Sequence, residues 1–320
     1  MIDIGERHSE SRFQVAAFYC FKFLENKTIT SLIDEALLLS EQYNVRGMVL
    51  FASEGINGTI CGSKEGVSRL INLINSTYQR HSLEVKYSFC NKQAFRRFRI
   101  RRKAEIITMG VEDINPNVLV GNYVEPSEWN NYLDDPNTLI IDTRNDYEIA
   151  VGSFEGALNP CIDVFSEFPS WVKNTLRSII EEKRPSNIAM FCTGGIRCEK
   201  ATSYLIKEGY TGVNQLHGGI LRYLEEVPKD KSRWNGECFV FDRRVSLNHD
   251  LLPGIHRLCN ACGMPLSPAD CEKSTYIRGV KCHYCIDRFS DDDRKRFAER
   301  QKHIDELIKE SPESTMWPNP

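Results

Sequence analysis

Cys192 is the residue of this 320-residue sequence whose surroundings best suit chemistry. An apolar run ends at Cys192, and the loop Thr193-Gly194-Gly195-Ile196-Arg197 then leads into a helical pattern. The glycines allow the loop to curl so that its N–H groups, with those of the helix N-terminus, converge on one point. A cysteine in such a cradle is expected to be a thiolate near neutral pH, and therefore a nucleophile.

Arg197 narrows the chemistry of this loop. Four residues, 193–196, separate it from Cys192, one fewer than in the cysteine-dependent phosphatases, so the loop suits a sulfur or oxygen anion smaller than phosphate. The alternative is a purely structural role, in which Cys192 is only a small apolar residue at the end of a strand. The glycine pair and the start of a helix directly after Cys192 disfavour this alternative. Cys198 is either an inert helix cysteine or a resolving thiol.

A second group of cysteines has the spacing of a metal site. Nineteen residues separate two Cys-x2-Cys pairs, and two such pairs typically close a tetrahedral zinc site. Four sulfurs fill every position, so the predicted zinc is structural and leaves none for a substrate. The alternative is a set of reduced thiols without metal. The predicted ligands are Cys259, Cys262, Cys282 and Cys285.

The elements around Cys192 alternate between strands and helices, which predicts an α/β domain with a parallel sheet. In such sheets ligands bind at the carboxyl ends of the strands, where Cys192 is placed. The expected strands are 138–144, 187–192 and 213–219, and the expected helices are 171–183, 197–210 and 220–227.

The first 90 residues follow the order βαββαβ, typical of a ferredoxin-like (acylphosphatase-like) domain. The expected strands are 12–24, two within 45–63 joined by a tight Gly/Asn turn, and 83–90; the helices are 29–43, capped by Thr30 or Ser31, and 64–78. Near the end, Ser290 is expected to cap a helix over 290–310, and the tail 311–320 is expected to be disordered.

A strongly basic segment follows this first domain. Residues 1–110 hold 16 Lys and Arg against 11 Asp and Glu, whereas residues 111–320 hold 25 against 33. The segment is either a solvated edge strand or a surface that binds phosphates, with Phe95, Phe98 and Ile100 interleaved; we favour the second interpretation. Its six basic residues are Arg96, Arg97, Arg99, Arg101, Arg102 and Lys103.

Composition favours a multidomain protein of the cytoplasm. Hydrophobic residues make up 41% and charged residues 27% of the chain, as in ordinary globular proteins. No apolar run approaches the roughly 18 residues that span a bilayer, and the polar start is unlike a secretory signal. In the cytoplasm the 12 cysteines are expected to be thiols, metal ligands or catalytic groups rather than disulfides.

Several motifs resemble the rhodanese domain and, most closely, one rhodanese-containing family, the oxygen-dependent tRNA uridine-34 hydroxylases. The resemblance extends over nearly the whole chain. The pattern of elements along the chain predicts domains at 1–110, 126–230 and 231–320, with a linker at 111–125. The motifs are "LIIDTRNDYEIAVGSFEGALNP" (139–160), "FCTGGIRCEKA" (191–201), "LHGGILRYLEE" (216–226), "FASEGINGTICGS" (51–63), "WNGECFVFDRRV" (234–245) and the cysteine-rich segment.

The resemblance implies an oxidoreductase that converts the wobble uridine of tRNA to 5-hydroxyuridine with molecular oxygen and contacts the anticodon arm. Cys192 matches the rhodanese active-site cysteine, and Asp142 and Arg144 match an Asp-x-Arg motif, which we interpret as a structural salt bridge that supports the loop. His217 departs from the expected pattern and is interpreted as a surface histidine.

The residues themselves leave the chemistry open. The sequence has no haem motif, no flavin or nicotinamide glycine fingerprint and no clear facial metal triad, and it does not indicate the electron donor or the oligomeric state. One hypothesis is that the Cys192 thiolate adds to C6 of uridine and activates C5; another is that Cys192 carries a persulfide. The alternative functions are a rhodanese-type sulfurtransferase that passes sulfur to a small acceptor or RNA, and a non-enzymatic RNA adaptor.

Overall fold

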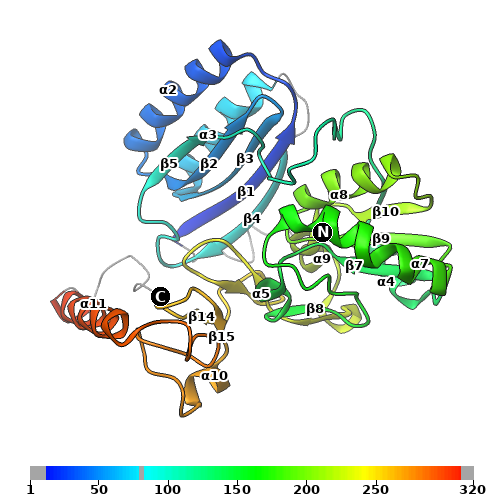
Figure 1. Ribbon diagram of the computed structural model, residues 1–320. Helices are drawn as coiled ribbons and strands as arrows, with labels where there is room; N and C mark the ends of the chain where they lie inside the picture. The colour runs from blue at the N-terminus through cyan, green and yellow to red at the C-terminus, as the bar shows by residue number, and fades with distance from the viewer. Residues whose placement is uncertain (1–11, 79–82, 311–320) are drawn as a thin grey trace.

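The structure is a computed structural model that describes residues 12–78 and 83–310. The N-terminal domain, in blue and cyan in Figure 1, lies beside a second α/β domain in green, and a smaller C-terminal region in orange and red lies below the N-terminal domain. Two predictions concern residues outside this range: that the sequence start is not a secretory signal, and that the tail 311–320 is disordered.

The N-terminal domain has the predicted βαββαβ order and a five-stranded sheet of order β4-β1-β3-β2-β5. Strands β1 to β4 pair antiparallel, while β5 adds to the edge parallel to β2. The elements are β1 (Phe13–Phe21), α2 (Asn26–Gln42), β2 (Arg46–Ala52), β3 (Gly55–Gly62), α3 (Lys64–Thr77), β4 (Glu84–Cys90) and β5 (Phe98–Arg102).

Helices α2 and α3 pack on one face of this sheet only (Figure 1). Alternate strand residues point to that face, and Phe18, Val49 and Ile60 join the helices in one buried core. The other face of the sheet is turned toward the second domain, whose residues line a cavity together with Tyr19 and Lys86.

Two local predictions in this domain are wrong. Helix α2 begins at Asn26 with Glu25 as its N-cap, and Thr30 lies inside the helix, where its hydroxyl donates to the Asn26 carbonyl. The turn between β2 and β3 is at residues 53–54, whereas Asn57 lies within β3. Gly55 after the turn is required because a Cβ there would lie 2.0 Å from the Cys20 carbonyl oxygen.

The second domain has the predicted parallel sheet, of order β6-β10-β9-β7. Helices α4 and α9 cover one face, and α8 with the α6–α7 helix covers the other. The α6–α7 helix is continuous through a π-helical turn at Val172–Leu176. The elements are β6 (Asn122–Val124), α4 (Pro126–Asp134), β7 (Thr138–Asp142), α5 (Asp146–Ile149), β8 (Gly152–Phe154), a 3-10 turn (Phe165–Glu167), α6 (Phe168–Trp171), α7 (Arg177–Lys183), β9 (Asn187–Phe191), α8 (Ile196–Lys207), β10 (Val213–Leu216) and α9 (Gly219–Glu226).

The C-terminal region consists of short hairpins and one long helix. β11 pairs with β8 of the second domain, and Trp234 packs into that domain's core. Ser290 caps α11 as predicted, since its hydroxyl accepts from the Asp293 N–H at 3.2 Å. The elements are a 3-10 turn (Lys229–Lys231), β11 (Trp234–Gly236), β12 (Cys238–Phe239), β13 (Ser246–Leu247), β14 (Arg257–Leu258), β15 (Pro265–Leu266), α10 (Pro268–Glu272) and α11 (Asp291–Glu310).

Neither end of the expected linker at 111–125 is free of the second domain. Val111, at its start, packs against a core of that domain, and residues 122–124, near its end, form strand β6. The exact domain boundaries stay predictions. Among the described residues, no helix combines the length and apolarity that crossing a membrane requires.

Candidate active site

Cys192 lies at the carboxyl end of β9, and α8 begins four residues later at Ile196. Its Sγ accepts a hydrogen bond from the Gly195 N–H at 3.1 Å. The start of α9 fixes the loop from behind, because the Ile220 N–H donates to the Cys192 carbonyl at 2.9 Å. Gly195 has φ +99°, and a Cβ there would lie 2.8 Å from the Tyr19 hydroxyl, so both backbone and space require glycine.

The loop favours the ionised form of Cys192. Burial opposes ionisation, but a hydrogen bond from the Cys198 thiol, the charge of Arg197 and the N–H groups of residues 197 and 198 outweigh it. Together they lower the pKa of Cys192 to about 5. Burial and the neighbouring Cys192 raise the pKa of Cys198, which is fully buried with its sulfur 3.6 Å from the Thr143 hydroxyl. Cys192 is therefore the thiolate of the pair and Cys198 the thiol.

Arg197 is held by a carboxylate that sequence reasoning missed. Glu148 is fully buried and accepts two hydrogen bonds from the Arg197 guanidinium, at 2.6 and 2.8 Å. Glu148 also accepts from the Asn145 N–H at the start of α5. The pair fixes the guanidinium close to Cys192, and no local sequence pattern links positions 148 and 197.

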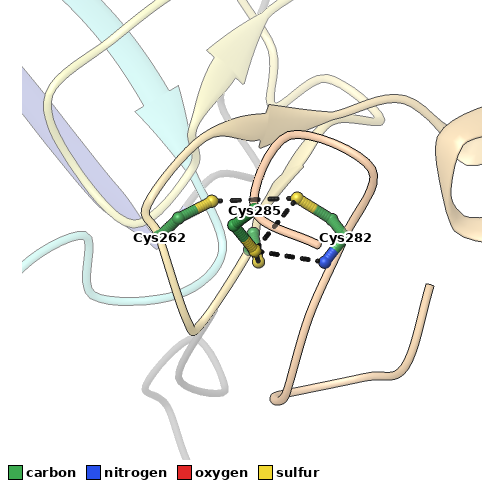
Figure 2. Close-up of side chains that lie close together, drawn as sticks. Cys262, Cys282 and Cys285 are labelled. Atoms are coloured by element: carbon green, nitrogen blue, oxygen red, sulfur yellow. Dashed lines mark hydrogen bonds between the residues drawn. The ribbon is translucent and has the colours of Figure 1, made fainter. Parts of the chain in front are cut away.

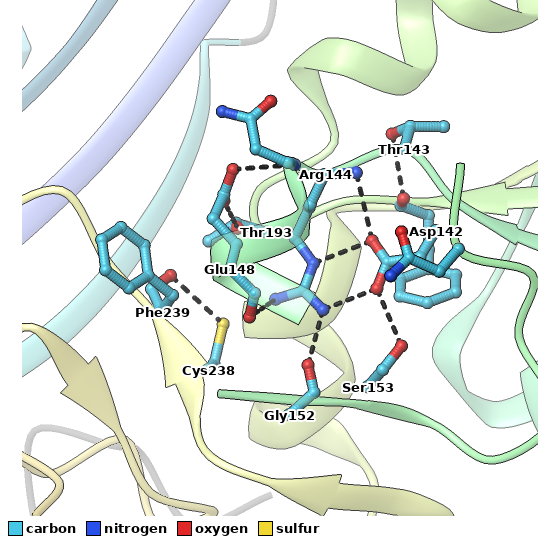
Figure 3. A network of polar contacts seen from close by, with 12 residues as sticks. Asp142, Thr143, Arg144, Glu148, Gly152, Ser153, Thr193, Cys238 and Phe239 are labelled. Carbon is cyan, nitrogen blue, oxygen red and sulfur yellow. Dashed lines mark hydrogen bonds and ion pairs between the residues drawn. The ribbon is translucent and has the colours of Figure 1, made fainter. Parts of the chain in front are cut away.

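Asp142 and Arg144 form the ion pair that we predicted (Figure 3). Both side chains are buried, and Arg144 donates to Asp142 at 2.6 and 2.9 Å and to the Gly152 carbonyl at 2.6 Å. Ser153 donates to the same carboxylate. The pair ties the end of β7 to β8 rather than lining the cavity at Cys192, in agreement with a structural role.

A cavity of about 490 Å³ opens onto Cys192 and is lined by both domains. Its volume lies within the range of about 300–1,000 Å³ that is typical of small-molecule sites. The second domain contributes Cys192, Thr193, Gly194, Ile196 and Arg197, all predicted as site residues. The N-terminal sheet contributes residues that sequence reasoning did not select, including Ala17, Tyr19, Asn57, Thr59 and Lys86.

Lys86 is a nearly buried cation in this cavity, with a side chain 5% exposed. Its ammonium donates to Glu84 at 3.1 Å and lies 4.9 Å from the centre of the Tyr19 ring. Burial lowers the pKa of Lys86 from its usual value, although Glu84 acts in the opposite direction. The cation thus lies in the same cavity as the Cys192 thiolate.

The two domains are joined by buried polar contacts next to the cavity. Tyr19 donates to Glu199 at 3.0 Å, and Tyr123 donates to the same carboxylate at 2.8 Å. Lys200, 2% exposed, pairs with Glu54 at 2.8 Å and with Glu105 at 2.6 Å. Helix α8 therefore carries both the Cys192 cradle and the groups that hold the N-terminal domain.

His217 is not the surface histidine that we expected. Its ring lies 2.7 Å from Glu125 and 3.5 Å from Glu84, and the hydrogen bond with Glu84 is the main cause that raises its pKa. Because Glu84 belongs to the N-terminal sheet, His217 is part of the interface between the domains. The interpretation failed because the partner carboxylate is distant in sequence.

The basic segment forms the edge strand β5, and all six of its predicted RNA-binding residues are exposed. Phe98 and Ile100 pack against the helix-covered core. The edge-strand geometry is therefore present, while contact between these side chains and RNA stays a prediction.

Four cysteines of the C-terminal region converge as predicted, and Figure 2 shows three of them, Cys262, Cys282 and Cys285. Their sulfurs all lie within 4.8 Å of one another, with separations such as 3.7 Å for Cys262–Cys282 and 4.0 Å for Cys259–Cys285. Tetrahedral zinc–sulfur bonds of about 2.3 Å place sulfurs about 3.8 Å apart, so the arrangement fits zinc. Cys271 packs beside the cluster but is not one of its four members.

Fold and site together define a protein with an acylphosphatase-like domain joined to a rhodanese domain. Residues 13–106 match the family described as UPF0176 acylphosphatase like domain, and residues 125–226 match the rhodanese-like domain. A solved rhodanese-related protein from Thermoplasma volcanium covers 33% of this chain and 93% of its own, at 22% identity and a TM-score of 0.27.

The chain is similar over almost its full length to curated proteins named tRNA uridine(34) hydroxylase. One from Prochlorococcus marinus is 56% identical over 310 residues, covering 97% of each chain. One from Parasynechococcus marenigrum is 52% identical and covers 94% of this chain and 95% of its own. The protein belongs to the tRNA uridine(34) hydroxylase family.

Proposed function

We propose that this protein hydroxylates the wobble uridine of tRNA, at position 34, to 5-hydroxyuridine, with molecular oxygen as co-substrate and Cys192 as the reactive group. The observation that carries the proposal is the Cys192 Sγ, which accepts from the Gly195 N–H and is kept ionised by the Cys198 thiol and by Arg197, in a cavity that both domains line. Family membership supports tRNA as the substrate. An enzyme acting on tRNA is expected to work in the cytoplasm.

The thiolate gives a route to C5 of uridine, which is otherwise a poor nucleophile. Addition of the Cys192 sulfur to C6 places negative charge on C5 and on the C4 oxygen. C5 then forms a bond to oxygen, and a proton completes a C5 hydroperoxide. An external two-electron donor, with two protons, reduces the hydroperoxide to C5–OH and releases water. Loss of the C5 proton expels the thiolate and restores the double bond.

Lys86 is suited to stabilise this charge. It is the cation that the N-terminal domain contributes to the cavity lining, and its burial strengthens its interaction with an anion. The Cys198 thiol, which donates to Cys192, keeps the sulfur ionised before attack. A Cys192 persulfide would be held by the same N–H groups, so the rhodanese-type sulfurtransferase is the rival function.

The cysteine cluster supplies structure rather than reaction steps. Zinc on Cys259, Cys262, Cys282 and Cys285 would have four protein ligands and would hold the C-terminal region together. Because all four positions are filled, we assign it no part in oxygen chemistry.

The test is nucleoside mass spectrometry of total tRNA from aerobically grown cells with the gene, without it, and with the Cys192→Ser variant. We expect 5-hydroxyuridine and its derivatives to fall without the gene and to stay low in the variant, while purified Cys192→Ser still binds tRNA. A strain shown to lack other routes to the nucleoside is the proper host. Persistence of 5-hydroxyuridine together with loss of a thiolated nucleoside would instead identify a sulfurtransferase.

A further inference from the structure

The helix-free face of the N-terminal sheet links the cavity to the basic edge strand. Strand register places Lys86 beside Ala17, Ala17 beside Thr59, Thr59 beside Met48, and Met48 beside Arg99. These five residues form one row across all five strands. The first three line the cavity that holds Cys192, and the last belongs to the exposed basic segment.

The row has dimensions that suit a nucleotide chain. Neighbouring strands lie about 4.8 Å apart, so the Arg99 backbone is about 10 Å from Thr59 at the cavity wall. Thr59 and Met48, the two residues of the row that precede Arg99, are only partly buried. The parallel row through Asn57 and Leu50 to Arg101 differs, because Asn57 donates to the Ile106 carbonyl at 2.9 Å and the chain after β5 crosses it there.

The basic residues of β5 do not all share this face. Phe98 and Ile100 point to the core under the helices, so Arg99 between them points to the opposite face. Arg102 lies on the helix side, where its guanidinium donates to the Thr30 hydroxyl of α2. The segment therefore presents Arg99, rather than all six cations, toward the cavity.

Phe241 adds an independent feature at the same cavity. It lines the cavity although its side chain is 62% exposed, and its ring packs edge-on against Phe239 with the ring centres 5.2 Å apart. The following Arg243 donates its N–H to the Ala94 carbonyl, which anchors this segment to the N-terminal domain. A supported aromatic ring with an open face is a surface on which an unpaired base can stack.

We propose that single-stranded RNA reaches the cavity over the row of Thr59, Met48 and Arg99, with Arg99 on a phosphate and a base stacked on Phe241. The inference rests on the proposed function and specifies how the loop that carries the modified uridine is held. A loop nucleotide is already unpaired, so turning its base into the cavity requires little free energy. Phosphate contacts hold the backbone, while stacking accepts any base next to the uridine.

The test compares single variants of the full-length protein in tRNA binding, by fluorescence anisotropy over a series of salt concentrations. Arg99→Ala is expected to weaken binding and to reduce the salt slope by about one unit, as expected for one lost phosphate contact. Phe241→Ala is expected to weaken binding about tenfold, within the range for one stacked base, and Phe241→Trp to restore it. Arg69→Ala on α3, under the other face, is the control expected to bind as wild type.

The outcomes separate this inference from the proposed function. Wild-type binding by Arg99→Ala or by Phe241→Ala would overturn the RNA path. So would equal weakening by Arg99→Ala and by Arg102→Ala, a comparison variant on the helix side of the sheet. Those results overturn it even where wild-type protein forms 5-hydroxyuridine. The other combination is that the expected binding differences appear in a protein whose wild type forms no 5-hydroxyuridine. That result would support the RNA path and contradict the hydroxylase proposal.

Discussion

The Tyr19 hydroxyl donates a 3.0 Å hydrogen bond to Glu199, a carboxylate 180 residues further along the chain. Tyr19 lies on the first strand of the N-terminal domain, and Glu199 on the helix that begins at the Cys192 loop. The same hydroxyl lies over Gly195, the residue that donates its N–H to Cys192. The N-terminal domain is therefore part of the wall around the reactive sulfur and not merely an appended module.

The pH dependence of alkylation tests the electrostatics of Cys192. Because its pKa is lowered to about 5, the thiolate predominates at neutral pH and is lost only as the pH falls through 5. Alkylation of Cys192 by iodoacetamide should therefore be nearly constant from pH 8 to pH 6 and half-maximal near pH 5. Free cysteine, with a pKa of about 8.5, loses reactivity about tenfold per unit over the lower part of that range.

The measurement is peptide mass spectrometry after short exposure to the reagent, with exposed Cys161 as an internal check on reagent activity. The Cys198→Ala variant removes a hydrogen bond to the thiolate, so the midpoint for Cys192 should move to higher pH. A midpoint above 8 in the wild type would show that the loop does not stabilise the Cys192 thiolate.

Lys86 gives a prediction about rate rather than binding. Lys86→Met removes the cation that the N-terminal domain contributes to the cavity lining, while Glu84 keeps its contact with His217. Loss of one preorganised group that stabilises charge typically lowers the rate by about 100-fold or more. We expect a fall of that size in single-turnover formation of 5-hydroxyuridine, with tRNA affinity changed less than threefold.

Two further variants separate charge from packing. Lys86→Arg should recover part of the rate, and Lys64→Met, an exposed lysine on α3, should behave as wild type. Unchanged turnover in Lys86→Met would remove this residue from the reaction.

The sequence predicted the parts of the site that depend on local spacing. Short motifs contain Cys192, its glycine loop and the four clustered cysteines. The chemistry of each motif can be inferred from residues close together in the sequence. Tyr19, Lys86 and Glu148 were missed because each acquires its role from a residue far away in the chain. An alternating strand shows that Lys86 shares a face with Glu84, but not that a second domain covers that face.

Glu199 yields a prediction about stability. Burial raises the pKa of this carboxyl despite the donors Tyr123, Tyr19 and Gln215, so its ionised form is less favourable in the folded than in the unfolded protein. The contribution of Glu199 to the free energy of unfolding is fully present below the unfolded pKa of about 4.3. It is lost as the pH rises through the pKa of the folded state. Glu199→Gln lacks this titration, so its stability relative to wild type should increase from pH 4 to pH 8.

The expected gain between pH 4 and pH 8 is about 1.4 kcal/mol for each unit by which folding raises this pKa, measured by denaturant unfolding at each pH. Glu208→Gln, an exposed residue at the end of the same helix, provides the matched control with no expected trend. A variant that loses stability relative to wild type as the pH rises would show that the three donors outweigh burial.

The cysteine cluster predicts one zinc ion per chain and a C-terminal region that depends on it. Its four sulfurs lie at the separations of a tetrahedral site, and α11 docks beside it through Phe289 against Phe297 and through Asn260 donating to Gln301. Cys282→Ser should abolish stoichiometric zinc in elemental analysis and increase hydrogen exchange over 257–305, because structural zinc sites contribute directly to folding. Cys271→Ser, beside the cluster, should keep both zinc and protection. Zinc-free wild-type protein with a fully protected C-terminal region would show that packing alone holds these thiols together.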